Sequence, residues 1–289
     1  MIKNSISAVA FTFNEENYIG ELIDSIILQS IKVEKIIICD DFSTDKTKEV
    51  VARKRQEYKD CADIQLLENS KKGKVFAYEK ALIKVDTDYF FVCGGDDVIG
   101  DTYVSEMLDF VTLHQIDFAY ANPLWCDEFL NPFNRVKKEL FYNFEDLLYS
   151  NWVGGFLFAK SNVVDAFLPF PEGLEFEDWY VGLSLSKIYG LAYINCDSSY
   201  FYRRHYNATT TVDSIHKGHE LVKRTIRFYD YMLEFGVDGD FIKLRKLSLK
   251  SRIDRLSAKQ FMSIIFSNRI EIVEKLKVCY FYFVSRNRF

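Results

Sequence analysis

The stretch Tyr89-Phe90-Phe91-Val92-Cys93-Gly94-Gly95-Asp96-Asp97 joins a short apolar run to two glycines and two adjacent carboxylates. Its short, aromatic and β-branched first half predicts a buried strand at 89–93. Open α/β sheets bind ligands at the carboxyl ends of their strands, so Asp96 and Asp97 mark a candidate site. Adjacent carboxylates repel each other unless a cation is near, and oxygen ligands suit Mg²⁺ or Mn²⁺. A solvated Asp-Asp turn is the alternative interpretation.

Strand-like and helix-like segments alternate on both sides of this stretch. Strands are predicted at 5–13, 35–39, 64–67, 89–93 and 116–120, and helices at 16–30, 44–58, 72–84 and 101–114. Ser43 or Thr44 is predicted to cap the second helix. The alternation predicts a mostly parallel sheet with right-handed crossovers, whose ligand-facing loops are 12–16, 40–45, 68–73 and 94–100.

Several common sites are excluded by their missing motifs. The 13 glycines form no G-x-G pair and no P-loop, so the dinucleotide fingerprint is absent. A calcium loop starting at Asp41 fails, because Lys46 replaces the glycine at its sixth position and Ala52 the terminal glutamate. The six cysteines are scattered singly, which argues against zinc and for reduced thiols in a cytosolic protein.

The second half of the chain changes character. Residues 122–149 have little periodicity and indicate a long irregular excursion; strands are predicted at 156–159, 191–196 and 199–203, and a helix ends near Tyr189. From about Asp213 the chain is helical in pattern. We therefore predict a catalytic domain at 1–212, made of a nucleotide-binding half (1–122) and an acceptor-side half (123–212), followed by a basic helical region at 213–289.

Charge is distributed unevenly along the chain. The net charge is −5, yet residues 242–289 hold 12 Lys or Arg and 3 Asp or Glu. This basic segment predicts an anionic partner, such as a membrane surface; packing on the main domain or on a second copy is the alternative. With no 18-residue apolar run and no signal peptide, we expect a cytoplasmic protein, peripheral on the inner face of the membrane. Nucleic acid is not expected, because no recognition motif is present.

Five segments in order carry a resemblance to a known family. They are Thr12-Phe13-Asn14-Glu15, Ser25-Ile26-Ile27-Leu28-Gln29, Asp40-Asp41-Phe42-Ser43-Thr44-Asp45, Gly94-Gly95-Asp96-Asp97 and Glu177-Asp178-Trp179. Residues 5–210 resemble the inverting glycosyltransferases of family 2. The resemblance implies the GT-A fold, an α/β architecture with a Rossmann-like, mostly parallel central sheet flanked by helices. Here a C-terminal helical appendage is added.

The resemblance also implies roles at the donor site. Asp41 is expected to hydrogen-bond the nucleotide base, although an Asx-turn is the alternative. Asp97 is expected to bind the metal, and Asp96 the ribose or a metal-bound water. The family's first metal-site Asp is Gly94 here, so we expect weak metal affinity without donor. The remaining nucleotide-binding residues are expected to be Phe11, Thr12, Asn14 and Glu15.

Further roles follow on the acceptor side. Asp178 is implied as the general base that deprotonates the acceptor hydroxyl, although acids at a helix start also favour its dipole. The segment 202–209 resembles a family motif that implies diphosphate contact by Arg203 and Arg204, and metal contact by His205. A polar loop is the alternative. The other residues expected near diphosphate or acceptor are Glu177, Trp152 and Trp179, the tryptophans stacking on a sugar unless they pack in the core.

Together these features predict an inverting, metal-dependent glycosyltransferase. Its donor is expected to be a UDP-sugar, and its acceptor a hydroxyl of a glycan or lipid-linked precursor in cell-surface polysaccharide synthesis. One alternative is a non-catalytic scaffold of the same fold that binds nucleotide-sugar or glycan, which Gly94 favours. Another is a sugar-nucleotide nucleotidylyltransferase, disfavoured because the loop at 14–17 lacks the expected glycines and cations. The oligomeric state stays open.

Overall fold

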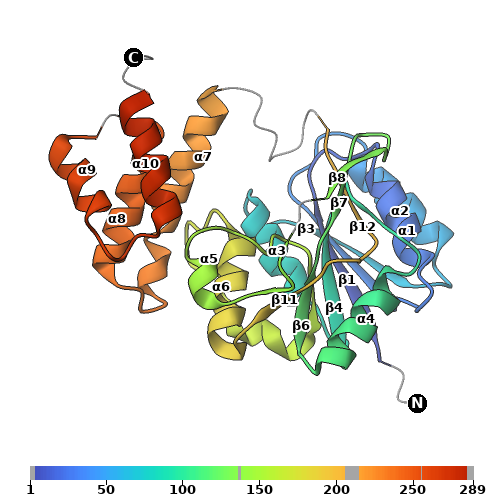
Figure 1. The fold of residues 1–289 in the computed structure, drawn as a ribbon. Helices are drawn as coiled ribbons and strands as arrows, with labels where there is room; N and C mark the ends of the chain where they lie inside the picture. The colour runs from blue at the N-terminus through green and yellow to red at the C-terminus, as the bar shows by residue number, and fades with distance from the viewer. Residues whose placement is uncertain (1–3, 136–137, 206–214, 255, 285–289) are drawn as a thin grey trace. The chain divides into compact units, whose positions relative to one another are not determined.

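The computed structural model describes residues 4–135, 138–205, 215–254 and 256–284. The chain divides into two compact units, Met1–Ala208 and Thr209–Phe289. The first unit is α/β and the second is helical (Figure 1). The predicted α/β fold class with a helical appendage is thus confirmed. The domain boundary that we predict at 212/213 lies outside the described residues and stays a prediction.

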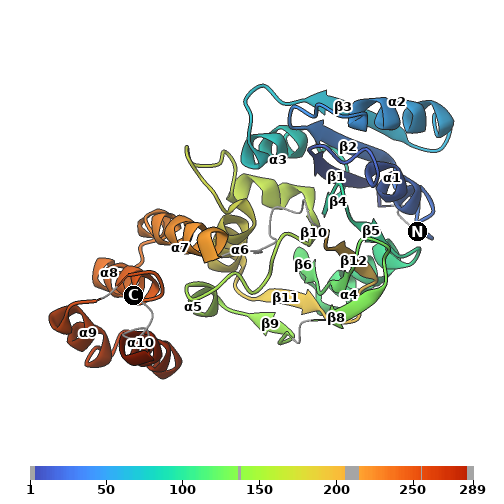
Figure 2. The ribbon, with the colours of Figure 1, turned by 90° about the horizontal axis from the view of Figure 1, so that it is seen from above.

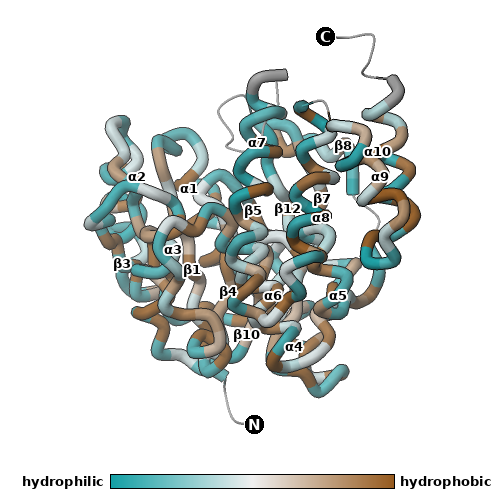
Figure 3. The backbone as a smooth tube through the Cα atoms, turned by 90° about the vertical axis from the view of Figure 1, so that its left-hand side faces the viewer, coloured by the Kyte–Doolittle hydropathy of each residue, from teal (hydrophilic) through white to brown (hydrophobic). Residues whose placement is uncertain are grey.

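A mostly parallel sheet forms the centre of the first unit. Its strand order is β3-β2-β1-β4-β10-β6-β11-β9, and β10 runs antiparallel to β4 and β6. Figure 2 shows β3, β2, β1 and β4 side by side, and Figure 3 shows β1 and β4 as largely hydrophobic segments. The strands are β1 (Ile6–Thr12), β2 (Lys35–Asp40), β3 (Asp63–Glu68), β4 (Tyr89–Gly94), β6 (Phe118–Ala121), β9 (Phe141–Tyr142), β10 (Leu157–Lys160) and β11 (Ala192–Asn195).

Helices cover both faces of this sheet. α1, α2 and α4 share a core with alternate residues of β1 and β2, while α3 packs on the other face. The core side of α1 repeats at helical spacing, with Ile19, Leu22, Ile23 and Ile26 buried. The helices are α1 (Ile19–Ile27), α2 (Thr47–Glu57), α3 (Lys74–Leu82), α4 (Tyr103–His114) and α6 (Glu177–Tyr189).

The predicted cap of α2 is wrong. Neither Ser43 nor Thr44 caps the helix, which begins at Thr47. Instead the Asp45 carboxylate accepts hydrogen bonds from the backbone N–H and the hydroxyl of Thr47, at 2.9 and 2.6 Å. Ser43 is used elsewhere, because its hydroxyl accepts the backbone N–H of Asn14 at 2.9 Å.

Residues 122–149 contain more regular structure than we predicted. Two strands from this range, β7 and β8, belong to a second sheet of order β5-β12-β7-β8. The strand β9 and the helix α5 follow in the same range. Strands of two to four residues are too short to display the period of two that identifies a strand in a sequence. The elements are β5 (Val98–Ile99), β7 (Leu124–Cys126), β8 (Pro132–Arg135), β12 (Tyr200–Arg203), α5 (Phe144–Leu147) and η1 (Ser161–Ala166).

The second unit is a small helical assembly with a buried ionic centre. Arg245 on α8 pairs with Glu274 on α10 at 2.7 Å, and both side chains are almost fully buried. Phe261 on α9 stacks on Tyr282 of α10 with 4.1 Å between ring centroids. None of the helices within the described ranges is long and apolar enough to cross a membrane. The elements are α7 (Ile215–Phe228), η2 (Tyr231–Leu233), α8 (Gly239–Lys250), α9 (Ala258–Ile265) and α10 (Ile272–Val284).

Candidate active site

The sequence motifs converge at the carboxyl ends of β1, β2 and β4. In the parallel register, Phe11 of β1 lies between Cys39 of β2 and Gly94 of β4. Backbone hydrogen bonds continue past the strand ends, since Gly95 N–H donates to the Phe11 carbonyl at 3.1 Å. Three segments far apart in sequence therefore meet at one edge of the sheet, where open α/β sheets bind ligands.

The loop after β1 is joined to the loop after β2. Asn14 has a positive φ of 55°, and its side-chain oxygen accepts the backbone N–H of Thr44 at 2.7 Å. The Thr47 hydroxyl accepts the N–H of Glu15 at 2.7 Å. Asparagine tolerates this left-handed backbone conformation better than most residues. The turn at 14–17 is therefore held by the loop after β2 and by the first residue of helix α2.

Asp41 fixes the loop that precedes α3. Its carboxylate accepts the backbone N–H of Gly73 at 2.8 and 3.0 Å and the side-chain amide of Asn69 at 2.8 Å. Gly73 has φ 138°, a conformation that side chains disfavour. Asp41 thus ties the loop after β2 to the loop after β3. Each carboxylate oxygen has two lone pairs, so capacity remains for one further donor.

The two aspartates of the opening stretch have different surroundings. Asp97 is 2% exposed and accepts hydrogen bonds from the Tyr200 hydroxyl at 2.7 Å and the Arg203 N–H at 3.1 Å. The N–H of Gly94 is a third donor, at 3.2 Å. Asp96 instead lies 3.0 Å from Nε2 of His205. Asp97, which we expected to bind metal, is thus enclosed by protein donors, and Asp96 has the imidazole partner.

Negative charge is concentrated around this turn. Burial, followed by the charge of Asp96, raises the pKa of Asp97 well above its usual value. The same two causes raise the pKa of Glu15, whose carboxylate accepts the Thr12 hydroxyl at 2.9 Å. A Cβ at Gly95 would lie 1.9 Å from the Glu15 carboxylate, so only glycine fits there. Asp96, Asp97 and Glu15 therefore concentrate negative charge at one turn, where a nearby cation is favourable.

A divalent cation fits the Asp96 and His205 pair. Carboxylate oxygen and imidazole nitrogen are both ligands that Mn²⁺ accepts, and here they already face each other. Within the described ranges, no group of three or more His, Cys, Asp or Glu is arranged to hold a metal. A cation at this pair would therefore need further ligands from a bound substrate, such as diphosphate oxygens.

Arg203 does not have the surroundings that we expected for a diphosphate ligand. It is 2% exposed, and its guanidinium donates to the carbonyls of Asp96 at 2.8 Å and Glu128 at 2.6 Å. A third donation reaches the carboxylate of Glu21. The side chain therefore holds the acidic turn in place. Its neighbour Arg204 is less buried and lies over the ring of Trp125, 5.2 Å from the centroid.

The rest of the 202–209 motif is only partly described. His205 packs against the ring of Tyr18, with 4.9 Å between centroids, in addition to its contact with Asp96. Residues 206–209 lie outside the described residues, so the resemblance of that segment is not tested by the structure.

Glu177 and Asp178 are the first two residues of α6. Lys74 connects Glu177 with the carboxyl end of β1. Glu177 is 3% exposed and pairs with Lys74 at 2.6 Å. The ammonium of Lys74 also lies 4.8 Å from the ring centroid of Phe11. Burial raises the pKa of Glu177, while the charge of Lys74 opposes that rise. Lys74 thereby connects the end of β1 with the start of α6.

Asp178 lies beside a glycine pair in the segment before β10. A Cβ at Gly155 would lie 3.6 Å from Cβ of Asp178. Asp178 accepts the N–H of Trp179 at 2.8 Å. Burial raises the pKa of Tyr120, and the charge of Asp178 adds to that rise. Burial lowers the pKa of Lys138 to about 8, and the charge of Asp178 is one of the effects that oppose this fall. Because Gly155 has no side chain, this position places none against Asp178.

The two expected stacking residues differ. Trp179 is 5% exposed and donates its indole N–H to the Leu147 carbonyl at 2.7 Å, so it belongs to the core and cannot present a ring to a sugar. Trp152 is 43% exposed and stacks on Tyr142, with centroids 5.7 Å apart and planes 9° from parallel. Trp152 therefore has the exposed, supported ring that carbohydrate stacking requires.

Sequence reasoning missed three residues of this site. The sequence patterns give no role to Lys74, Tyr18 or Tyr200. Only the position of Lys74 at the start of a helix after a ligand-facing loop could have signalled it. The contacts of Tyr200 with Asp97 join residues 103 positions apart, which no local pattern reveals.

The comparisons with known proteins identify the family of this chain. The family model described as glycosyl transferase family 2 matches residues 7–165, more than half of the chain. A Methanococcus voltae dolichyl N-acetyl-alpha-D-glucosaminyl phosphate 3-beta-D-2,3-diacetamido-2,3-dideoxy-beta-D-glucuronosyltransferase is 32% identical over 93 residues, 32% of this chain and 29% of that protein. The Escherichia coli UDP-Glc:alpha-D-GlcNAc-diphosphoundecaprenol beta-1,3-glucosyltransferase WfaP is 29% identical over 117 residues, covering 40% and 45%. The matches thus span less than half the length of these relatives.

Solved structures share the fold over nearly the whole chain. S. aureus TarS 1–349 in complex with UDP-GlcNAc has a TM-score of 0.61 at 16% identity, covering 96% of this chain and 79% of that one. The mannosyltransferase PcManGT from Pyrobaculum calidifontis, in complex with GDP-Man and Mn²⁺, has a TM-score of 0.59 at 14% identity, covering 99% and 76%. At such identities the likeness concerns the fold, which is that of GT-A glycosyltransferases. With the matched family model and the converging motifs, the chain belongs to glycosyl transferase family 2.

Proposed function

We propose that this protein is an inverting, metal-dependent glycosyltransferase that uses a nucleotide-sugar donor. The observation that carries the proposal is the chain of contacts from the acidic turn to Asp178. Gly94 pairs with Phe11, Lys74 lies over Phe11, and Lys74 pairs with Glu177 next to Asp178. A donor held at the acidic turn therefore has a carboxylate base within the same site.

The donor is proposed to be a UDP-sugar. The UDP-GlcNAc complex of TarS and the UDP-Glc in the name of WfaP support this class. In this chain, Asp41 has the capacity to accept the imide N–H of uracil, and its backbone N–H donates to the Thr12 carbonyl at 2.9 Å. Phe11, Thr12, Asn14 and Glu15, at the end of β1, are proposed to complete the nucleotide contacts. The base contact by Asp41 is a proposal that rests on its position at the end of β2.

Asp178 is proposed as the general base. It takes the proton from an acceptor hydroxyl while that oxygen attacks the sugar C1 and the bond to the diphosphate breaks. Attack from the side opposite the leaving group inverts the anomeric centre. Lys74, which pairs with Glu177 at 2.6 Å, supplies positive charge next to the proposed base. Its charge opposes the rise in the pKa of Glu177 that burial causes.

Asp96 and His205 are proposed to hold a Mn²⁺ or Mg²⁺ ion, with Asp97 as the residue that positions them. When bound, the ion supplies positive charge against the diphosphate leaving group. Arg203 orients the turn through the Asp96 carbonyl. Arg204, which lies over the ring of Trp125, is the remaining candidate for phosphate contact. Because Gly94 stands where the family has an aspartate, the proposed metal site has one carboxylate fewer than the family pattern.

The acceptor is proposed to be a hydroxyl of a glycan or lipid-linked precursor in cell-surface polysaccharide synthesis. WfaP is named for a diphosphoundecaprenol-linked acceptor, and a Staphylococcus epidermidis relative is a teichoic acid poly(glycerol phosphate) polymerase. Trp152, exposed and stacked on Tyr142, is the proposed contact for an acceptor sugar. A cytoplasmic location with peripheral membrane attachment suits such an acceptor.

The decisive experiment measures UDP release from candidate UDP-sugars with Mn²⁺, Mg²⁺ or EDTA. We expect metal-stimulated release by the parent and loss of release in EDTA. Asp178→Asn is expected to bind UDP normally while transfer falls by roughly 10²–10⁴-fold. Asp165→Asn, an exposed acid in η1, is the matched control and should leave both unchanged.

The same experiment distinguishes the proposed enzyme from a non-catalytic scaffold. The scaffold is favoured by Gly94, which stands where the family has its first metal-site Asp. Tight UDP-sugar binding without turnover under any metal would establish the scaffold. Loss of UDP affinity in Asp178→Asn would move that residue from base to donor site.

A further inference from the structure

Helix α10 exposes a stripe of apolar side chains. Ile272, Leu276 and Tyr280 follow one another at intervals of four residues, so they lie on one face of the helix. Their exposed fractions are 73%, 65% and 58%, and Val273 beside them is 54% exposed. Glu274 and Val278 lie on the buried face. Large apolar side chains grouped in this way mark an interaction surface more often than scattered ones do.

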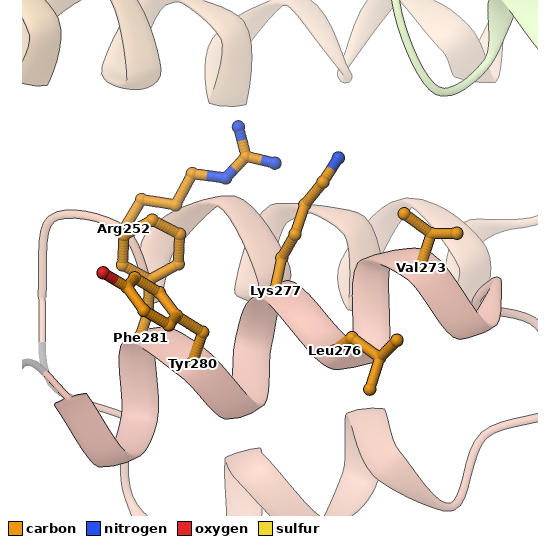
Figure 4. A pocket seen from close by; sticks show the side chains of 6 residues that line it. All are labelled: Arg252, Val273, Leu276, Lys277, Tyr280 and Phe281. Carbon is orange, nitrogen blue, oxygen red and sulfur yellow. The ribbon is translucent and has the colours of Figure 1, made fainter.

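Two cations border this stripe. A cavity of about 560 Å³ is lined by Arg252, Val273, Leu276, Lys277, Tyr280 and Phe281. Figure 4 shows the charged ends of Arg252 and Lys277 pointing the same way, away from the α10 ribbon. We name these six residues together with Ile272 the α10 surface. It combines open apolar side chains with positive charge.

The positive charge at this surface exceeds the negative charge beneath it. The single carboxylate of Glu274 is approached by Lys277 at 2.6 Å, Arg245 at 2.7 Å and Arg252 at 3.3 Å. One anion therefore faces three cations, and the cluster keeps an excess of two positive charges. Glu271, before the helix, is the nearest exposed acid in sequence, and it lies at the end of the stripe away from Tyr280.

We propose that the α10 surface docks on a membrane that contains anionic phospholipid. The lipid phosphates pair with Arg252 and Lys277, and the apolar stripe enters the region between headgroups and acyl chains. Amphipathic helices with cations beside an apolar face bind at such interfaces, and each cation adds about 1 kcal/mol near an anionic leaflet. No helix within the described ranges, α10 included, is long and apolar enough to cross a membrane, so the proposal concerns docking on its surface.

A second copy of the chain is the less favourable occupant. A symmetric dimer through this face would bring Arg252 and Lys277 of one copy towards the same cations of the other, which repel. Residues 242–289 carry 12 Lys or Arg against 3 Asp or Glu, so the whole region repels its own copy and attracts an anionic leaflet. The docking does not depend on Asp178 or on the donor site.

The test is co-sedimentation of the full chain with vesicles of phosphatidylcholine alone and with about 30 mol % phosphatidylglycerol. We expect binding only to the anionic vesicles, weakened by added NaCl. Leu276→Asp and the double variant Arg252→Gln/Lys277→Gln should each lower the bound fraction about tenfold, which corresponds to roughly 1.4 kcal/mol. Leu113→Asp, at a 77% exposed position on α4, is the matched control.

Folding and catalysis are followed in the same samples. Thermal unfolding should be the same for parent and Leu276→Asp, and UDP release without vesicles should be unchanged. Equal binding to neutral vesicles, no binding to either kind, or an equal loss in Leu113→Asp would overturn the proposal. So would a parent dimer in analytical ultracentrifugation that Leu276→Asp converts to monomer, because a second copy would then cover this surface.

Discussion

At the residue scale, adjacent carboxylates differ through their partners. Asp97 receives three protein donors and is buried, whereas Asp96 faces an imidazole and keeps partial exposure. The two aspartate side chains therefore have different roles. Asp97 joins β4 to β12, and Asp96 is available to a ligand. Arg203 reinforces the difference, because it binds the Asp96 carbonyl and leaves the carboxylate oxygens open.

The pair gives a prediction that separates stability from metal use. Asp97→Ala leaves the Tyr200 hydroxyl and the Arg203 N–H without their acceptor, which costs about 1–3 kcal/mol of unfolding free energy. Asp97→Asn should cost less, because an amide oxygen still accepts and the buried charge is gone. Asp96→Ala should unfold like the parent but lose Mn²⁺ stimulation of UDP release. Thermal melts and metal titrations check both; an unchanged Tm in Asp97→Ala would contradict the assignment.

At the element scale, the contact between two turns shapes the donor site, and the pairing of two helices holds the helical unit together. The turn after β4 brings Gly95 against the carboxylate of Glu15 and the side chain of Thr12, so the turn after β1 and the turn after β4 occupy adjacent space. In the helical unit, α8 and α10 are joined through a buried ion pair in addition to apolar contacts. Each arrangement supports a prediction.

Gly95→Ala is expected to disturb the donor site. Its new Cβ would lie 1.9 Å from the Glu15 carboxylate and 2.9 Å from Cβ of Thr12, so one of the two turns must move. Overpacking of this kind costs about 1–3 kcal/mol, and we expect UDP affinity to fall on the order of tenfold. Gly239→Ala, where nothing lies within 4 Å of the new Cβ, is the control. Equal UDP affinities measured by calorimetry would show that the turn has more freedom than this packing implies.

Glu274 is expected to make the helical unit sensitive to acid. Despite desolvation, the charge of Arg245 and its neighbours lowers the pKa of Glu274 to about 2. A depressed folded-state pKa contributes stability that is present above the unfolded value of about 4.3 and is lost as pH falls towards 2. Glu274→Gln should remove this dependence and cost about 3–5 kcal/mol at neutral pH, because the buried guanidinium of Arg245 loses its charged partner. Denaturation of parent, Glu274→Gln and exposed Glu271→Gln at pH 2–7 measures both effects. A steep acid transition retained by Glu274→Gln would place its origin in another carboxylate.

At the scale of the whole molecule, the site residues and the basic helices belong to different compact units. The proposed donor and base residues fall within 11–205, and the α10 surface within 252–281. The separation assigns chemistry to one unit and attachment to the other. It also makes the domain division testable.

A chain of residues 1–212 is therefore expected to retain metal-dependent UDP release while losing binding to anionic vesicles. The reason is that the core of the first unit is built from its own helices and strands. Circular dichroism and size-exclusion chromatography establish folding first, and release and co-sedimentation follow. A folded fragment without UDP release would mean that the second unit completes the site.

The local elements and the motif positions could be predicted from the sequence. Buried parallel strands such as 35–39 and 89–93 are continuous apolar runs, and amphipathic helices such as α1 repeat at 3.6 residues, so both patterns are visible in any window of the chain. The parallel sheet follows from their alternation, and it fixes which loops share an edge. The family resemblance added the chemistry of the motifs.

The partners of individual side chains were decided only by the tertiary structure. Arg203 and Asp96 are 107 positions apart, and Lys74 and Glu177 are 103 apart, so their pairing depends on how β12 and α6 return to the first sheet. Trp179 and Arg203 became buried for the same reason, while Trp152 and Asp96 did not. A sequence states which groups are present and where strands end. The distances between side chains and the burial of each side chain set its hydrogen bonds and its pKa. Both are defined only in the folded chain.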